Sequence, residues 1–93
     1  MALADVPDGG GVIVDYKGAP VVVVRTGDTV KAFNASCTHQ GTTVAPPVNG
    51  VMTCPNHGSQ FSATDGSVKN PPATKALKSV PVTVNGGQVV ATA

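Results

Sequence analysis

Both cysteines and both histidines of the chain lie within one short stretch, where they form two mixed pairs. Cys37 stands two positions before His39, and Cys54 stands three positions before His57. Thiolate and imidazole are ligands for zinc and for iron–sulfur clusters, and a cysteine near a histidine can also be an activated nucleophile. Because the chain contains no other cysteine or histidine, their gathering predicts one metal or redox site rather than four unrelated side chains.

Several chemistries compete for these four side chains. A disulfide would leave the histidines without a role, and a nucleophilic cysteine would leave the second pair without one. Zinc sites usually group cysteine with cysteine and histidine with histidine, whereas each pair here is mixed. A two-iron cluster, with one iron bound by the cysteines and the other by the histidines, fits the mixed pairs better. A zinc-stapled β-domain that serves as a binding module remains the alternative.

The scaffold that carries these pairs is predicted to be all-β. Eleven glycines and eight prolines interrupt the chain, and no long segment has the apolar repeat of a helix. Short runs rich in valine and threonine predict strands instead. These runs cover Gly11–Tyr16, Pro20–Thr26, Thr29–Asn34, Gly50–Thr53, Gln60–Ser62, Leu77–Asn85 and Gln88–Thr92. Many short strands joined by turns indicate a sandwich or a partly open barrel.

We expect residues 1–93 to form a single domain, because a chain of this length supports one core. The metal-binding side chains then belong to two loops, the first ligand loop at about residues 35–49 and the second at about residues 54–59. A third loop, at about residues 69–74, is stiffened by Pro71 and Pro72. Alternation in the strand region places Val80, Val82 and Val84 on one face.

Composition excludes several classes of function. The net charge of +1 and the presence of only one tyrosine and two phenylalanines argue against binding of nucleic acid. No apolar run is long enough to span a membrane. The first eleven residues lack the charged and apolar regions of a signal peptide.

The ligand pattern resembles the Rieske iron–sulfur family, whose motif is Cys-x-His, a spacer, and then Cys-x-x-His. The spacer here, from Gln40 to Thr53, has fourteen residues, which is slightly short for the family. The segments 57-HGSQF-61 and 65-DG-66 extend the likeness, which covers most of the chain from residue 11 onward, and CTHQG with 3-LADVPDGGGV-12 is similar to small exported Rieske proteins of actinobacteria. The resemblance implies a small antiparallel β-sandwich or partly open barrel with a two-loop subdomain. That subdomain would bind a [2Fe–2S] cluster through Cys37, His39, Cys54 and His57.

The resemblance also assigns roles to residues around the ligands. Ser59 matches a serine that donates to a bridging sulfide in high-potential members, whereas Phe61 stands where those members have a hydrogen-bonding tyrosine. Thr42 and Asn56 stand where those members have a disulfide between the loops, and Gly41 and Gly58 follow the histidines closely. With one potential-raising feature present and two absent, we expect an intermediate reduction potential within the span of about −150 to +300 mV of Rieske centres.

The implied function is transfer of single electrons without substrate chemistry. No further histidine is left for the mononuclear iron site of an oxygenase, so the chain is expected to be an electron carrier and not an enzyme. Its alternative role is that of a ferredoxin component that feeds a ring-hydroxylating oxygenase. We expect a monomeric domain, exported or tethered to a membrane by an anchor outside this chain, with a cytoplasmic location as the second choice.

A redox protein is expected to dock at the exposed tip that carries the histidines. Five apolar residues are predicted to form a docking collar around that tip, although proline in these positions also stiffens a loop. The predicted collar consists of Val44, Pro46, Pro47, Pro71 and Pro72.

Overall fold

The computed structural model describes residues 1–36, 43–55, 58–70 and 75–91 of the chain. Within these ranges it has nine strands and one short 3-10 turn, η1 (Leu3–Asp5). The strands are β1 (Gly11–Tyr16), β2 (Ala19–Thr26), β3 (Thr29–Asn34), β4 (Val51–Thr53), β5 (Gln60–Ser62), β6 (Val68–Asn70), β7 (Ser79–Val80), β8 (Val82–Asn85) and β9 (Gln88–Ala91). None of the helical structure in these ranges is long and apolar enough to cross a membrane.

The central layer is an antiparallel sheet with the strand order β1-β2-β3-β7. One of its two inner strands, β2, has four consecutive buried valines at residues 21–24. Because successive side chains of a strand point to opposite faces, these valines divide between two cores. Val22 and Val24 belong to one hydrophobic cluster, and Val21 and Val23 belong to the other.

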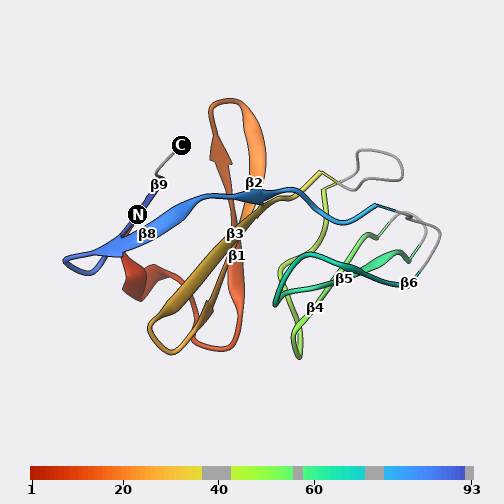
Figure 1. Cartoon of the computed structure of the whole chain (residues 1–93), viewed down its shortest axis with the longest axis horizontal. Helices are drawn as coiled ribbons and strands as arrows, with labels where there is room; N and C mark the ends of the chain where they lie inside the picture. Colours follow the sequence, from red (N-terminus) through yellow and green to blue (C-terminus); the bar gives the residue numbers. More distant parts are fainter. Residues whose placement is uncertain (37–42, 56–57, 71–74, 92–93) are drawn as a thin grey trace.

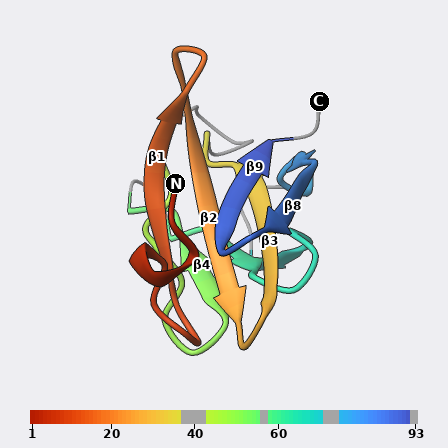
Figure 2. The same ribbon diagram turned by 90° about the vertical axis from the view of Figure 1, so that its left-hand side faces the viewer.

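Two smaller sheets cover the two faces of this layer. The sheet β4-β5-β6 contributes Met52 and Phe61 to the cluster of Val22 and Val24. The hairpin β8-β9 contributes Val89 to the opposite cluster. Figure 1 shows β4, β5 and β6 to one side of the crossing strands β1–β3, and Figure 2 shows β8 and β9 in front of β2 and β3. The predicted all-β fold is confirmed, as an arrangement of stacked antiparallel sheets that form no closed barrel within the described residues.

Most predicted strand boundaries hold to within one residue, the predicted end at Thr92 lies outside the described residues, and the prediction fails at two places. The bounds of β1, β3 and β5 match the predicted ranges, but the predicted strand 77–85 is divided by Pro81 into β7 and β8, which belong to different sheets. Pro81 has no backbone N–H for a ladder, so the chain changes sheets there. Strand β6 was not predicted, because Lys69 and Asn70 are exposed and only Val68 is partly buried. Val80, Val82 and Val84 were predicted to share one strand face. All three pack against one cluster, but Val80 belongs to a different sheet from the other two.

A tight contact at Gly66 holds the sheet β4-β5-β6 against the central layer. Gly66 has a φ of +77°, and a Cβ there would lie 2.9 Å from the carbonyl oxygen of Leu77 and 3.0 Å from the Phe33 ring. Its carbonyl accepts the backbone N–H of Leu77 at 2.9 Å. Glycine alone combines this left-handed backbone with so close an approach, so the connection between β5 and β6 also serves as a packing point.

Candidate metal centre

The second ligand loop is the connection between β4 and β5. Cys54 directly follows β4, and its backbone N–H donates to the carbonyl of Ser59 at 2.7 Å, just before β5 begins. The N–H of Gly58 donates back to the carbonyl of Cys54 at 3.1 Å, and Gly58 adopts a φ of +79°. The loop is thus closed at its base by backbone hydrogen bonds, and its one described ligand residue, Cys54, is fixed at the end of a strand.

The first ligand loop is closed in a similar way by residues on either side of its ligands. Ser36 and Thr43 form an isolated antiparallel bridge, and the N–H of Val44 donates to the carbonyl of Ala35 at 2.8 Å. The Asn34 side chain accepts the N–H of Ser36 at 2.9 Å. Because β3 ends at Asn34, the stem of this loop directly follows a strand of the central sheet.

The stems of the two ligand loops are joined to each other. The N–H of Ala45, beyond the bridge of the first loop, donates to the carbonyl of Thr53 at 2.8 Å. Thr53 is the residue before Cys54, so one backbone hydrogen bond links the exit of the first loop to the entrance of the second. The described parts of both loops therefore start side by side, as a site with ligands from both would require.

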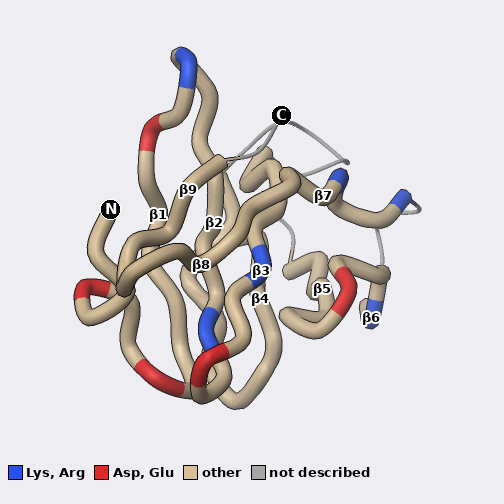
Figure 3. Tube along the Cα trace, turned by 60° about the vertical axis from the view of Figure 1, so that its left-hand side comes forward, with Lys and Arg blue, Asp and Glu red and all other residues tan. Residues whose placement is uncertain are grey.

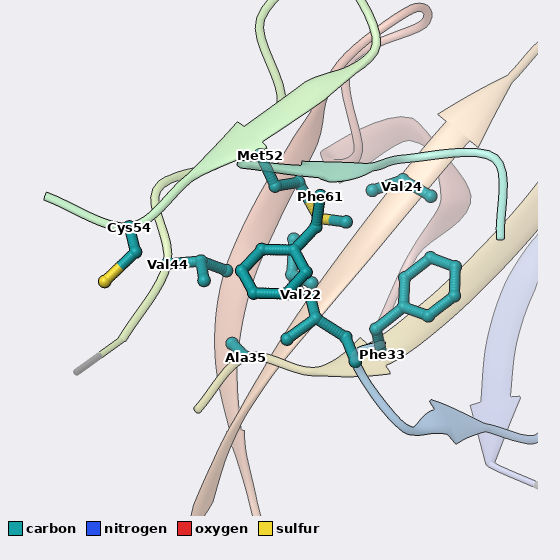
Figure 4. Close-up of a cluster of buried hydrophobic side chains, with 9 residues drawn as sticks. Val22, Val24, Phe33, Ala35, Val44, Met52, Cys54 and Phe61 are labelled. Carbon is teal, nitrogen blue, oxygen red and sulfur yellow. The ribbon is translucent and has the colours of Figure 1, made fainter. Parts of the chain in front are cut away.

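The thiol of Cys54 lies at the boundary of the core. The residue is 1% exposed, belongs to the same hydrophobic cluster as Val44, Met52 and Phe61, and is a free cysteine. Figure 4 shows Cys54 at the edge of this cluster, with its sulfur directed away from the Phe61 ring. A buried free thiol at the rim of an apolar cluster can bind a soft metal and is shielded from water, so Cys54 fits a role as an iron ligand.

Three of the four predicted ligands, Cys37, His39 and His57, lie outside the described residues, as do Gly41, Thr42 and Asn56. No three histidine, cysteine or acidic side chains gather within the parts of the chain that the structure describes. The convergence of the four ligands therefore stays a prediction, supported by the joined stems and by the position of Cys54.

Two residues predicted to tune the site, Ser59 and Phe61, are fully buried. Both have 0% of their surface exposed, and Phe61 sits in the cluster that contains Cys54. They belong to β5 or to the residue before it, so the same hairpin that fixes Cys54 also fixes them. Their side chains are therefore held near the predicted ligand loop, in surroundings of low polarity.

The predicted docking collar is only partly on the surface. Val44 is 1% exposed and Pro47 is buried, so these two side chains pack inward and cannot offer a surface to a partner. Pro46 is exposed, and Pro71 and Pro72 lie outside the described residues. Val44 and Pro47 face inward on either side of the exposed Ala45 and Pro46, where the segment runs beside β4 and Pro47 lies against Gly11 of β1.

A contact that the sequence did not reveal ties the third loop to the second ligand loop. The side-chain amide of Asn70 donates to the carbonyl of Gly58 at 3.4 Å. Asn70 ends β6, whose neighbour β5 begins at Gln60. The only sequence signal was an asparagine before two prolines, which indicates a loop but not its partner.

The sequence matches one protein-family profile and several curated proteins over most of its length. The profile of the Rieske [2Fe–2S] domain matches residues 1–81. The cytochrome b6-f complex iron-sulfur subunit of Chlorobaculum tepidum is 33% identical to the chain over 88 residues, which cover 94% of this chain and 48% of that one. The 3-phenylpropionate/cinnamic acid dioxygenase ferredoxin subunit of Shigella flexneri is 30% identical over 91 residues, which cover 94% and 84% respectively.

Among solved structures, the plasma membrane Rieske protein PetC3 from Synechocystis PCC 6803 superposes with a TM-score of 0.85 at 34% identity, over 99% of this chain and 95% of that one. The chain spans about half or less of the length of the first curated relatives that it matches. The likeness therefore concerns one part of each of these relatives.

Proposed function

Since this chain belongs to the Rieske [2Fe–2S] domain family, we propose that Cys37, His39, Cys54 and His57 hold its cluster. The family binds a [2Fe–2S] cluster through two cysteines and two histidines, and the predicted cofactor is confirmed. The chain is an electron-transfer protein and not itself a catalyst, in line with its relatives among iron-sulfur subunits and ferredoxins. The zinc-stapled binding module is therefore not retained.

The observation that carries the ligand assignment is the hydrogen bond between Ala45 and Thr53. It sets the two ligand loops side by side and leaves Cys54 at the entrance of the second. One cysteine and one histidine from each loop would then supply all the protein ligands that a cluster held by two cysteines and two histidines needs. In this arrangement each loop contributes a sulfur to one iron and a nitrogen to the other.

The bound cluster supplies a site that accepts and returns one electron. The protein's part is to hold the ligands in one geometry in both oxidation states and to keep water away. The hydrogen bonds of Cys54 with Ser59 and Gly58 fix the second loop, and the burial of Cys54 and Phe61 excludes water from that side. Fixed dipoles in a site of low dielectric need little rearrangement when charge changes, which favours rapid transfer.

The ligand assignment is tested by measuring the iron and sulfide content of the purified protein and by recording its EPR spectrum. We expect two irons and two acid-labile sulfides per chain, and a Rieske-type EPR spectrum after reduction. Replacing Cys54 by alanine should abolish both, whereas replacing the exposed Lys17, in the turn between β1 and β2, should leave both intact. A colourless wild-type protein that contains zinc would refute the assignment.

Its reduction potential is proposed to be intermediate within the Rieske span of about −150 to +300 mV. The sequence keeps Ser59 but has Phe61, Thr42 and Asn56 at the positions of the tyrosine and the disulfide of high-potential relatives. A redox titration followed by circular dichroism measures this value directly.

A second candidate role is that of a ferredoxin that delivers electrons to a ring-hydroxylating oxygenase. It is favoured by the likeness to the dioxygenase ferredoxin subunit, 84% of which this chain covers, compared with 48% of the b6-f subunit. A potential near the lower end of the Rieske span would support this role, and one near the upper end would support a place in a membrane electron-transfer chain.

The partner is proposed to approach the tip of the two ligand loops, where Pro46, Pro71 and Pro72 remain as candidate collar residues. The location is proposed to be outside the cytoplasm or at a membrane surface, because relatives include a plasma membrane Rieske protein and b6-f complex subunits. Fractionation of cells that produce the protein naturally, followed by immunodetection, tests this. Recovery in the cytoplasmic fraction would favour the ferredoxin role instead.

A further inference from the structure

Charge is divided unevenly along the chain. Four of the five acidic residues precede residue 29, whereas the remainder of the chain carries four lysines and a single aspartate, Asp65. Figure 3 shows blue segments beside β6 and β7 on one side of the molecule, and most of the red segments on the side of the N-terminus and of β1. The half that carries the ligand loops is therefore positive, and the opposite half is negative.

Three of those lysines, Lys69, Lys75 and Lys78, lie within ten residues and are exposed. We call them the lysine surface. Lys75 and Lys78 lie on either side of Leu77, which is 3% exposed and belongs to the same cluster as Cys54, whereas Lys69 is part of β6. The buried leucine anchors residues 75–78 to the core, and the pairing of β6 with β5 holds Lys69. Each of the three lysines therefore has a defined place on the protein.

The two segments that carry the lysine surface are hydrogen-bonded to the two ligand loops, one segment to each loop. The carbonyl of Lys78 accepts the N–H of Asn34 at 2.7 Å, two residues before Ser36 in the stem of the first loop. Asn70, next to Lys69, donates to the carbonyl of Gly58 in the second loop at 3.4 Å. Positive charge is thus attached to each of the two segments that hold the proposed ligands.

From this placement we propose that Lys69, Lys75 and Lys78 form the docking surface for an acidic face of the redox partner protein. The proposal rests on the proposed electron-transfer function and names the chemistry of its partner. A positive patch beside the electron exit, combined with a negative opposite half, turns an acidic partner toward the ligand loops as it approaches. One electron then crosses between the two proteins, and no bond or proton has to move with it.

An acidic protein fits this surface better than an anionic membrane. Segments that bind acidic lipids usually carry clusters of about four to eight basic residues, whereas this surface has three, on a chain with a net charge of only +1. Transient redox contacts are small, and a few opposite charges suffice to steer them.

The kinetic test uses flavodoxin hydroquinone, an acidic one-electron donor, as the probe. The oxidised holoprotein is mixed with it in a stopped-flow instrument, and one electron passes from the hydroquinone to the cluster while the flavin becomes a semiquinone. Lys69→Glu and Lys78→Glu should each lower the second-order rate constant by about tenfold at low salt, within the range of electrostatic steering. Both should also flatten its dependence on ionic strength.

Lys17→Glu is the matched control, since it makes the same charge change at an exposed lysine in the turn between β1 and β2. It should leave the rate nearly unchanged. An equal fall in this control would mean that only net charge matters and would overturn the proposal, as would wild-type rates in the two lysine-surface variants.

A second measurement does not depend on electron transfer. Carbodiimide joins lysine amines to carboxylates that lie in contact, so treating the mixture and mapping the products by mass spectrometry reports which lysines meet the flavodoxin. We expect cross-links at Lys69, Lys75 or Lys78, and their loss at 0.5 M salt, about five times the ionic strength at which the Debye length is near 10 Å. Cross-links chiefly at Lys17 or Lys31 would contradict the proposal.

Two further controls separate this proposal from the alternatives. Iron content and reduction potential are measured for every variant, so a protein without a cluster refutes the proposed function and is not mistaken for failed docking. Sedimentation with phosphatidylglycerol vesicles tests the membrane. Binding to vesicles that is lost in Lys69→Glu and Lys78→Glu, with unchanged flavodoxin rates, would replace the protein partner with a lipid surface.

Discussion

Gly11 and Pro47 are in direct contact across the boundary between the central sheet and the segment that follows the first ligand loop. A Cβ on Gly11 would lie 3.0 Å from the Cδ of Pro47 and 2.5 Å from the carbonyl oxygen of Val23. Pro47 is buried there. The part of the chain that carries the ligands is therefore seated on β1 at a point where only glycine leaves enough room.

Gly11→Ala is expected to destabilise the protein by about 1–3 kcal/mol, as overpacking of a rigid site usually does. The added methyl group meets backbone and a proline ring, neither of which can swing away. Chemical denaturation of the holoprotein measures the loss. The matched control is Gly10→Ala, because its nearest contact would be 3.4 Å from the Pro7 side chain. A Gly11→Ala variant as stable as Gly10→Ala would show that the contact is not tight.

Ser59→Ala is expected to lower the reduction potential, because a hydroxyl that donates to the cluster stabilises the reduced, more negative state. One neutral hydrogen bond is worth about 0.5–1.5 kcal/mol, which corresponds to a few tens of millivolts for one electron. Protein-film voltammetry checks the shift. Ser62→Ala is the control: this buried hydroxyl accepts the N–H of Thr64 at 3.2 Å. The control should lose stability but keep the potential, and an unchanged potential in Ser59→Ala would remove the proposed bond.

Phe61→Tyr is expected to raise the potential by a similar amount, provided that its hydroxyl reaches a ligand sulfur. Phe61 has no exposed surface and shares a cluster with Cys54. A new hydroxyl there either finds a partner or costs about 1–3 kcal/mol of stability as an unsatisfied buried group. A raised potential with little change in stability is therefore the expected pair of results. A large loss of stability at constant potential would place the hydroxyl away from the sulfur.

Removal of iron is expected to lower the free energy of unfolding by about 3–4 kcal/mol or more, the stabilisation given by a ligand present at a hundred to a thousand times its Kd. Since Thr42 and Asn56 provide no disulfide, the metal is the only covalent-strength link expected between the ligand loops. Thermal unfolding of holoprotein and chelated protein measures the difference. The Cys54→Ala variant lacks one of the proposed ligands, so its stability should be similar to that of the chelated protein. Equal stability with and without iron would show that the loops are held independently of the cluster.

Asp65 is expected to contribute to the pH dependence of stability. Its pKa is held below its usual value by the Ser67 hydroxyl and by the Ser67 N–H, which donates at 2.9 Å. The pKa of Asp65 is lower in the folded state than in the unfolded state, so its ionised form stabilises the fold. This stabilisation is fully present above the ordinary aspartate pKa of about 4, and it is lost as the pH falls through the folded-state pKa. Asp65→Asn should thus be less stable than the wild type at neutral pH, with a difference that shrinks in acid. A difference that is constant across this range would exclude the carboxylate as its source.

The sequence predicted the strands well where local pattern decides them. Strands β1, β3 and β5 have the predicted bounds because each pairs with a neighbour across a short connection between recognisable turn residues. The break between β7 and β8 at Pro81 was not predicted, because the valines before and after it continue one alternating pattern. All of these valines pack against the same hydrophobic cluster. Strand β6 was missed because pairing with β5, rather than its own residues, makes it a strand.

At the proposed metal site, the residue types predicted the chemistry, but they did not predict the hydrogen bonds and packing contacts that position the ligand loops. Cysteine and histidine are rare enough in this chain for their spacing to indicate a cluster. The hydrogen bond from Asn70 to Gly58 and the contact of Gly11 with Pro47 join residues that are twelve and thirty-six positions apart. Such pairs follow from how the layers stack, which no local pattern encodes. For the same reason, Val44 and Pro47 were predicted on the surface although they face inward.

The four consecutive buried valines of β2 determine how the domain can unfold. Val22 and Val24 belong to the core beneath the ligand loops, and Val21 and Val23 belong to the core beneath the β8-β9 hairpin. Neither core can be exposed without disturbing the strand that both share. Amide protons of β2 should therefore exchange with solvent only when the whole domain unfolds, and loss of iron at one end should accelerate exchange in residues that face the other.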